Sequence, residues 1–219
     1  MKSFGRLYDV SVILGAESFA YPGDPSYLVS RVKSIDAGDP VTLSALSTSA
    51  HAGTHLDAPA HFIAGGKFLD AYPPSRFVLP ARIIEITDPQ AVTRREIENN
   101  EVARGEAVLF KTENSRSGLV TRGEFSSRFV YIDGEAAQYL VEKGASLVGL
   151  DYITIDRYGD KNFTAHHVLL SNDVLLLESL NLKDVPPGRY TLIALPLRMQ
   201  AMEGSPARAV LTTRMKAEE

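Results

Sequence analysis

The sequence predicts one mixed α/β domain with a β-rich core. Three observations lead to this class. The chain has 219 residues, enough for one well-buried domain and short for two. Short apolar runs separated by turn signals recur along it and outnumber helical patterns. One stretch, residues 130–151, reads as strand, helix and strand in succession. We therefore expect a single domain over residues 1–219.

Short apolar runs predict most of the secondary structure. Before residue 130 we expect strands at Leu7–Leu14, Val41–Leu46, Phe77–Leu79, Ala81–Ile86 and Ala107–Phe110. Thr93 and Glu96 have the spacing of a capping box and predict a helix start. Val130–Ile132 and Leu147–Leu150 are expected to be parallel strands joined by a helix that ends at Gly144. Later strands are predicted at Val174–Leu177, Tyr190–Leu195 and Ala209–Thr213.

Composition excludes several classes of function. The formal net charge is −4, so no basic surface favours nucleic acid or an anionic membrane. No apolar run is long enough to cross a bilayer, and the N-terminus lacks signal-peptide features, so we expect a cytoplasmic location. The absence of cysteine excludes disulfides, thiolate metal ligands and cysteine nucleophiles. Any metal must be held by histidine, carboxylate, backbone or water.

Three of the five histidines lie within eleven residues, at His51, His55 and His61. On an extended backbone His55 and Asp57 point to the same face. Gly53 allows a turn that folds His51 towards them. Imidazole and carboxylate groups that converge with open coordination positions are what a catalytic metal requires. The alternative is that these are ordinary polar loop residues.

A second cluster surrounds the adjacent histidines His166 and His167. Glu178 ends an apolar run, and a buried carboxylate there needs a partner or a cation. A hairpin-like return across residues 171–173 would bring His166 and Glu178 together. The simpler interpretation, that Glu178 is exposed at a strand end, is slightly favoured by these residues alone.

Residues 51–61 match a long signature, H-x-G-T-H-x-D-x-P-x-H, at every fixed position. The segment resembles that of the cyclase-like metal hydrolases, which include bacterial kynurenine formamidase and isatin hydrolase. Shorter segments extend the resemblance over nearly the whole chain. They are P-G-D-P at residues 22–25, K-T-x-N-S at 111–115, V-G-x-D at 148–151, H-x(11)-E at 166–178, P-L at 196–197 and G-S-P-x-R at 204–208.

The resemblance implies a swivelling β/β/α fold that assembles as a homodimer or homotetramer, with residues 21–25 near a neighbouring site. It implies that His51, His55 and Asp57 bind a first metal ion and that Asp57 can bridge to a second. His166 and Glu178 resemble the ligands of the second ion, and His61 resembles the catalytic histidine. Because members of the family differ in metal content, we expect one or two ions of Zn²⁺ or Mn²⁺.

Histidine and carboxylate ligands suit both ions. Hydroxide generated on the metal would attack an amide carbonyl, and His61 would protonate the leaving nitrogen. An aryl amine leaves readily, which favours an arylformamide or a related cyclic amide as the small-molecule substrate. Tyr21, Phe62 and Phe68 are candidate walls for its ring, although they could equally be core residues.

Two other functions remain open at this point. A cyclase or dehydratase acting on a polyketide-like substrate would use the metal only as a Lewis acid. A protein that binds metal without turnover would have no need for a basic group beside an open metal position. His61 therefore favours the two enzymes over the non-catalytic protein.

Overall fold

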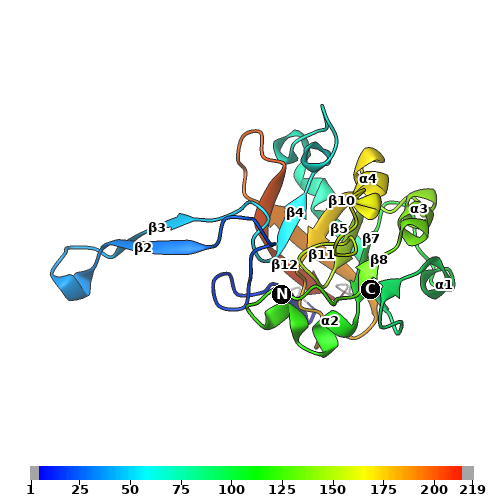
Figure 1. The fold of residues 1–219 in the computed structure, drawn as a ribbon, viewed down its shortest axis with the longest axis horizontal. Coiled ribbons are helices and arrows are strands. Elements are labelled where there is room, and N and C mark those ends of the chain that lie inside the picture. Colours follow the sequence, from blue (N-terminus) through cyan, green and yellow to red (C-terminus); the bar gives the residue numbers. More distant parts are fainter. Residues whose placement is uncertain (1–4, 214–219) are drawn as a thin grey trace, which may run out of the picture.

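The computed structural model describes residues 5–213 and is built on one closed sheet (Figure 1). Its strand order is β1-β12-β11-β5-β7-β9-β10-β4, and β4 also pairs with β12, so the sheet closes on itself with β1 attached to β12. The strands are β1 (Leu7–Asp9), β4 (His55–Asp57), β5 (Val78–Glu85), β7 (Ala107–Lys111), β9 (Leu147–Leu150), β10 (Leu175–Glu178), β11 (Gly188–Pro196) and β12 (Gly204–Thr212). The predicted α/β class with a β-rich core is confirmed.

Helices cover the outer face of β7, β9 and β10. They are α1 (Arg94–Ile97), α2 (Glu113–Arg116), α3 (Gly134–Lys143) and α4 (Thr164–Ser171). Successive residues of β7 enter two different apolar clusters: Phe110 packs with the helices, whereas Leu109 points into the cluster enclosed by the closed sheet. Both faces of these strands are buried, which explains why the central strands are almost continuously apolar.

Two small sheets lie outside the closed one. β6 (Ala91–Val92) and β8 (Tyr131–Ile132) form a short parallel pair. β2 (Leu28–Lys33) and β3 (Leu43–Ser47) form a hairpin arm that projects from the body, with a 3-10 turn (Ile35–Ala37) at its tip (Figure 1). Further 3-10 turns are Pro59–His61, Leu69–Ala71, Pro74–Arg76 and Leu119–Thr121.

Four predictions about secondary structure need correction. The first strand stops at Asp9. The two strands expected on either side of Pro80 form one continuous strand, β5. Pro80 can lie inside it because only β11 pairs with β5 at this position, and pairing with β7 begins at the next residue. The strands expected to flank α3 in parallel belong to different sheets. The helix predicted near Thr93 does begin there, since α1 starts at Arg94 with Thr93 as its N-cap residue, but the capping box itself is not formed: Thr93 makes no side-chain cap bond, and the Glu96 carboxylate accepts bonds from the backbone N–H groups of Thr87 and Asp88 instead.

The V-G-x-D and K-T-x-N-S segments fulfil a structural role. The buried carboxylate of Asp151 accepts hydrogen bonds from the backbone N–H of Thr112 (2.8 Å) and of Ser115 (3.0 Å) at the start of α2. This arrangement joins β9 to the end of β7.

Within residues 5–213 no helix is long and apolar enough to cross a membrane.

Candidate metal centre

The 51–57 segment is ordered by a glycine turn and a short strand. Gly53 has a positive φ of 61°, a conformation that glycine adopts without strain. β4 then places His55 and Asp57 on one face, while Leu56 points into the core enclosed by the sheet. His51 is folded back so that its Nδ1 lies 2.8 Å from Asp57 Oδ1. The extended backbone expected for this segment is the one observed.

Glu178 is buried beside this segment, contrary to the exposed strand end that its local sequence slightly favoured. β10 pairs antiparallel with β4, and this register places Glu178 directly opposite His55. Its Oε2 lies 3.2 Å from His55 Nε2. The pairing of two strands more than a hundred residues apart therefore brings Glu178 into the cluster.

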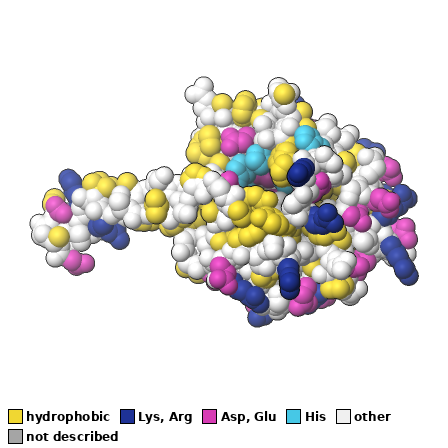
Figure 2. All heavy atoms as spheres, viewed as in Figure 1, with side chains coloured by type: hydrophobic (Ala, Val, Ile, Leu, Met, Phe, Trp, Pro, Cys, Tyr) yellow, Lys and Arg dark blue, Asp and Glu magenta, His cyan; other side chains and the backbone are white. Residues whose placement is uncertain are grey.

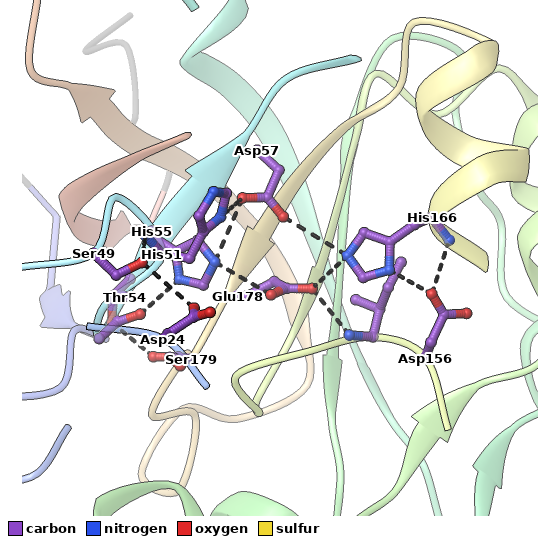
Figure 3. Close-up of polar contacts among 12 residues, drawn as sticks. Asp24, Ser49, His51, Thr54, His55, Asp57, Asp156, His166, Glu178 and Ser179 are labelled. Atoms are coloured by element: carbon purple, nitrogen blue, oxygen red, sulfur yellow. Dashed lines mark hydrogen bonds and ion pairs between the residues drawn. The ribbon is translucent and has the colours of Figure 1, made fainter. Parts of the chain in front are cut away.

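His166 reaches the same cluster from α4, a helix where a hairpin-like return was expected. Asp156 holds this helix in place, since its carboxylate accepts a bond from the backbone N–H of Ala165 (2.7 Å). The same carboxylate accepts a bond from His166 Nδ1 (Figure 3). His166 Nε2 consequently faces Glu178 Oε1 at 3.3 Å. The neighbouring His167 is exposed, so His166 is the histidine of this pair that joins the cluster.

Two possible ligand sets share one carboxylate. His51, His55 and Asp57 offer donor atoms within 4.8 Å of one another, and so do Asp57, His166 and Glu178. Figure 3 shows Asp57 between the two groups of side chains. All of these residues except the half-buried His51 are buried. The arrangement allows two cations, one on each side of Asp57.

The donor atoms of these residues fit a metal. Asp57 Oδ2 is buried and has no hydrogen-bond partner among the described residues, which is costly unless a cation satisfies it. His55 Nδ1 lies 2.8 Å from the Gly53 carbonyl and must carry the proton, so Nε2 presents its lone pair to the cluster. His166 is oriented in the same way by Asp156. Such outer partners are typical of metal-binding histidines.

The electrostatics of the cluster favour positive charge. Burial disfavours the charged form of His51, but the Asp57 carboxylate outweighs this effect and raises the pKa of His51 to about 9. Burial alone would raise the pKa of Asp57, whereas His51 and His55 hold this pKa well below its usual value. A divalent cation would compete with protons for the nitrogen and oxygen atoms of these side chains.

His61 lies beside both ligand sets and belongs to neither. Its ring stacks on that of His51, with centroids 4.0 Å apart and an interplanar angle of 22°. It also contacts Phe62 edge-on at 4.5 Å. Burial, together with the positive charges of His51 and His166, lowers the pKa of His61 below its usual value. A neutral imidazole at neutral pH is suited to accept a proton.

The cluster opens into a cavity of about 210 Å³. Of the predicted aromatic walls, Tyr21 and Phe62 line it, but Phe68 does not and has a side chain 39% exposed. Asp24, from the P-G-D-P segment, also lines it, and lining residues that no sequence pattern had indicated are Ile153, Thr154 and Phe163. On the face of the molecule drawn in Figure 2, histidine side chains reach the surface with acidic side chains near them.

Asp156 and Glu203 are two further residues of the cluster that no sequence pattern had indicated. Glu203 Oε1 lies 3.4 Å from His51 Nε2. A Cβ atom on the adjacent Gly204 would lie only 2.5 Å from the His51 ring, so glycine is required for the start of β12 to pack against this side chain. Neither Asp156 nor Glu203 forms a recognisable pattern with the histidines along the chain.

Comparisons with known proteins agree with this geometry. Residues 8–157 match the model of the Cyclase family. A kynurenine formamidase of Bacillus cereus is 34% identical over 203 residues, which cover 93% of this chain and 95% of the relative. The structure of a protein from Bacillus stearothermophilus described as a predicted metal-dependent hydrolase superposes with a TM-score of 0.82 at 30% identity, covering 97% of this chain and 100% of the other.

An isatin hydrolase bound to the product analogue thioisatinate superposes with a TM-score of 0.79 at 26% identity, covering 94% of this chain and 92% of the other. These relatives confirm the expected type of enzyme, a metal-dependent amidohydrolase. The sequence match over most of the chain and the shared fold lead to one conclusion: the chain belongs to the Cyclase family.

Proposed function

We propose that this enzyme hydrolyses the amide C–N bond of an arylformamide or a related cyclic amide, with Zn²⁺ or Mn²⁺ held by His51, His55 and Asp57 and a second ion held by Asp57, His166 and Glu178. One observation carries the proposal. An unliganded imidazole, His61, lies against a ligand of the first set and opens into the same cavity as both sets.

The chain's residues divide the chemistry between them. A divalent cation on this donor set supplies a Lewis acid that lowers the pKa of bound water to about 7 and polarises a carbonyl. His61, neutral because burial lowers its pKa, accepts the proton of the attacking water and delivers it to the leaving nitrogen. Asp156 keeps His166 in the tautomer that binds through Nε2.

The cavity favours a small aromatic substrate. Its volume of about 210 Å³ suits a single or fused pair of small rings, and it is small for a polyketide-like chain. Tyr21 and Phe62 line it, as does Phe163, whose ring centroid lies 5.1 Å from that of Phe62. Aromatic faces of this kind hold a flat ring by stacking. The size of the cavity thus favours the hydrolase over the alternative cyclase or dehydratase.

A hydrolysis screen on metal-analysed protein tests the proposal. N-formylkynurenine, formanilide and isatin are compared with an alkyl formamide of similar size. Turnover of an aryl substrate well above that of the alkyl formamide is expected, together with zinc or manganese in the active preparation. Equal rates on both kinds of substrate, or full activity after the metal has been removed, would contradict the proposal.

We also propose that the enzyme is a homo-oligomer assembled through the β2–β3 arm. Neither strand of the arm contains a buried residue, and Val29 and Leu46 face each other across it while 49% and 67% exposed. An isolated two-stranded hairpin is marginally stable in water, and exposed apolar clusters mark interfaces. A second copy of the chain is the occupant that the predicted dimer or tetramer would place there.

Light scattering measures this assembly directly. At micromolar concentration the wild type is expected at two or four times the 23.9 kDa of one chain. Leu46→Asp should shift the population towards the monomer, whereas Lys33→Gln, a polar change on the same arm, should leave it unchanged. A wild-type mass equal to one chain would refute the proposal, and so would an unchanged oligomer in Leu46→Asp.

A further inference from the structure

A second and larger cavity lies apart from the histidine cluster. Its volume is about 700 Å³, and it is formed by α2, the 3-10 turn at Leu119–Thr121 and the segments around residues 126–131 and 157–158. It shares no lining residue with the cavity that contains His61. None of its residues has a part in the proposed hydrolysis.

Three arginines line this second cavity: Arg122, Arg128 and Arg157. Among residues 5–213, no carboxylate lies within 4.0 Å of their guanidinium nitrogens, unlike those of Arg116 next to the cavity. The acidic lining residue Glu113 is already paired, because Arg116 Nε lies 3.1 Å from its Oε2. The three guanidinium groups therefore bring positive charge to the cavity that no ion pair within 4.0 Å neutralises among the described residues, and Asp160 acts on Arg157 only at longer range.

The wall bearing Arg128 is held in place by buried side chains. Tyr152 Oη donates to the Ser126 carbonyl at 2.7 Å and accepts from the Ser126 N–H at 2.8 Å. At the other end of the 126–130 segment, the Asn114 amide accepts a hydrogen bond from the Val130 N–H at 2.8 Å and donates one to the Val130 carbonyl at 2.9 Å. Because both ends are fixed, the segment between them is ordered before any ligand arrives, which lowers the cost of binding.

Aromatic side chains lie among the three arginines. Phe129, Tyr131 and Tyr158 line the cavity, and Phe129 is fixed by stacking on Tyr152 with ring centroids 4.3 Å apart. Guanidinium groups recognise carboxylates through paired hydrogen bonds, and aromatic faces accept flat rings. We propose that this cavity is a second binding site, specific for a planar organic carboxylate.

The second site adjoins the metal centre without being part of it. Arg157 directly follows Asp156, whose carboxylate holds His166. Tyr158 lies beside Tyr21 of the catalytic cavity, with ring centroids 6.4 Å apart. A carboxylate bound by Arg157 would thus lie one residue from the group that orients a metal ligand.

Calorimetric titration of the full-length protein with benzoate tests the site. Benzamide, a neutral molecule of the same shape, tests the need for charge, and inorganic phosphate tests the need for a ring. The variants are Arg122→Gln, Arg128→Gln and Arg157→Gln, alone and combined. Arg95→Gln is the matched control, since Arg95 is also exposed but does not line the cavity.

Benzoate is expected to bind the wild type and Arg95→Gln equally, and the triple variant at least about tenfold more weakly. Benzamide and phosphate should each bind the wild type at least about tenfold more weakly than benzoate does. Unchanged benzoate affinity in the triple variant would place the ligand elsewhere and overturn the proposal. Absence of benzoate binding at millimolar concentration, or equal affinity for phosphate, would overturn it as well.

Discussion

Replacement of His61 by alanine is expected to reduce kcat by about 10²–10⁴-fold while the metal content stays at the wild-type level. The structure explains both halves of this expectation. His61 belongs to neither ligand set, so its removal takes no donor from the metal. Its neutral ring is the proton-transfer group of the proposed reaction, and general acid–base groups contribute on this scale.

The stacking of His61 on His51 must be separated from proton transfer. The two rings lie 4.0 Å apart, and such a pair contributes about 0.5–1.5 kcal/mol, or at most about a tenfold effect. His61→Phe retains an aromatic ring against His51 but cannot transfer a proton. If proton transfer is the role of His61, the phenylalanine variant should lose kcat as severely as the alanine variant.

The assay measures metal content and kcat on the same preparations, across pH. Because the pKa of His61 is lowered from its usual value near 6.5, wild-type kcat should hold through neutral pH and fall only below that value, where His61 becomes protonated. This acidic limb should be missing in His61→Phe. Loss of metal from His61→Phe would make His61 a ligand, and a wild-type kcat would make it a bystander; either result would refute the reasoning.

Three further predictions concern the metal ligands and their supports. His166→Ala and Glu178→Ala should each lower the metal content by a similar amount, and wild-type content in both variants by plasma mass spectrometry would show that they are not ligands. Asp156→Asn should weaken metal affinity by about 10–100-fold, since it removes the charged partner of His166 Nδ1, and competition with a chromogenic chelator measures this change. A strong chelator should abolish activity and lower Tm, because a bound ion stabilises the folded state, and Zn²⁺ or Mn²⁺ should restore both; an unchanged Tm and activity would contradict a buried metal centre.

Local sequence was sufficient to predict the parts of the site that depend on local backbone geometry. The two-residue spacing of His55 and Asp57 puts them on one face of any extended segment, and Gly53 supplies the turn that returns His51. The apolar runs predicted the central strands because strands buried on both faces need continuous apolar residues. The signature over residues 51–61 then indicated the family.

The remaining parts of the site depend on non-local pairing and became visible only in the folded chain. Glu178 lies in the cluster because β10 pairs with β4 in the register that opposes it to His55, and no property of residues 174–178 specifies that register. Asp156 joins the site by holding the start of α4, and Glu203 does so because it directly precedes β12. The positions of both elements depend on the closed sheet. The arginine-lined cavity likewise arises from the packing of distant segments, since residues 113–131 and 157–158 both line it. Local spacing fixes which way side chains point, whereas the sheet fixes which of them meet.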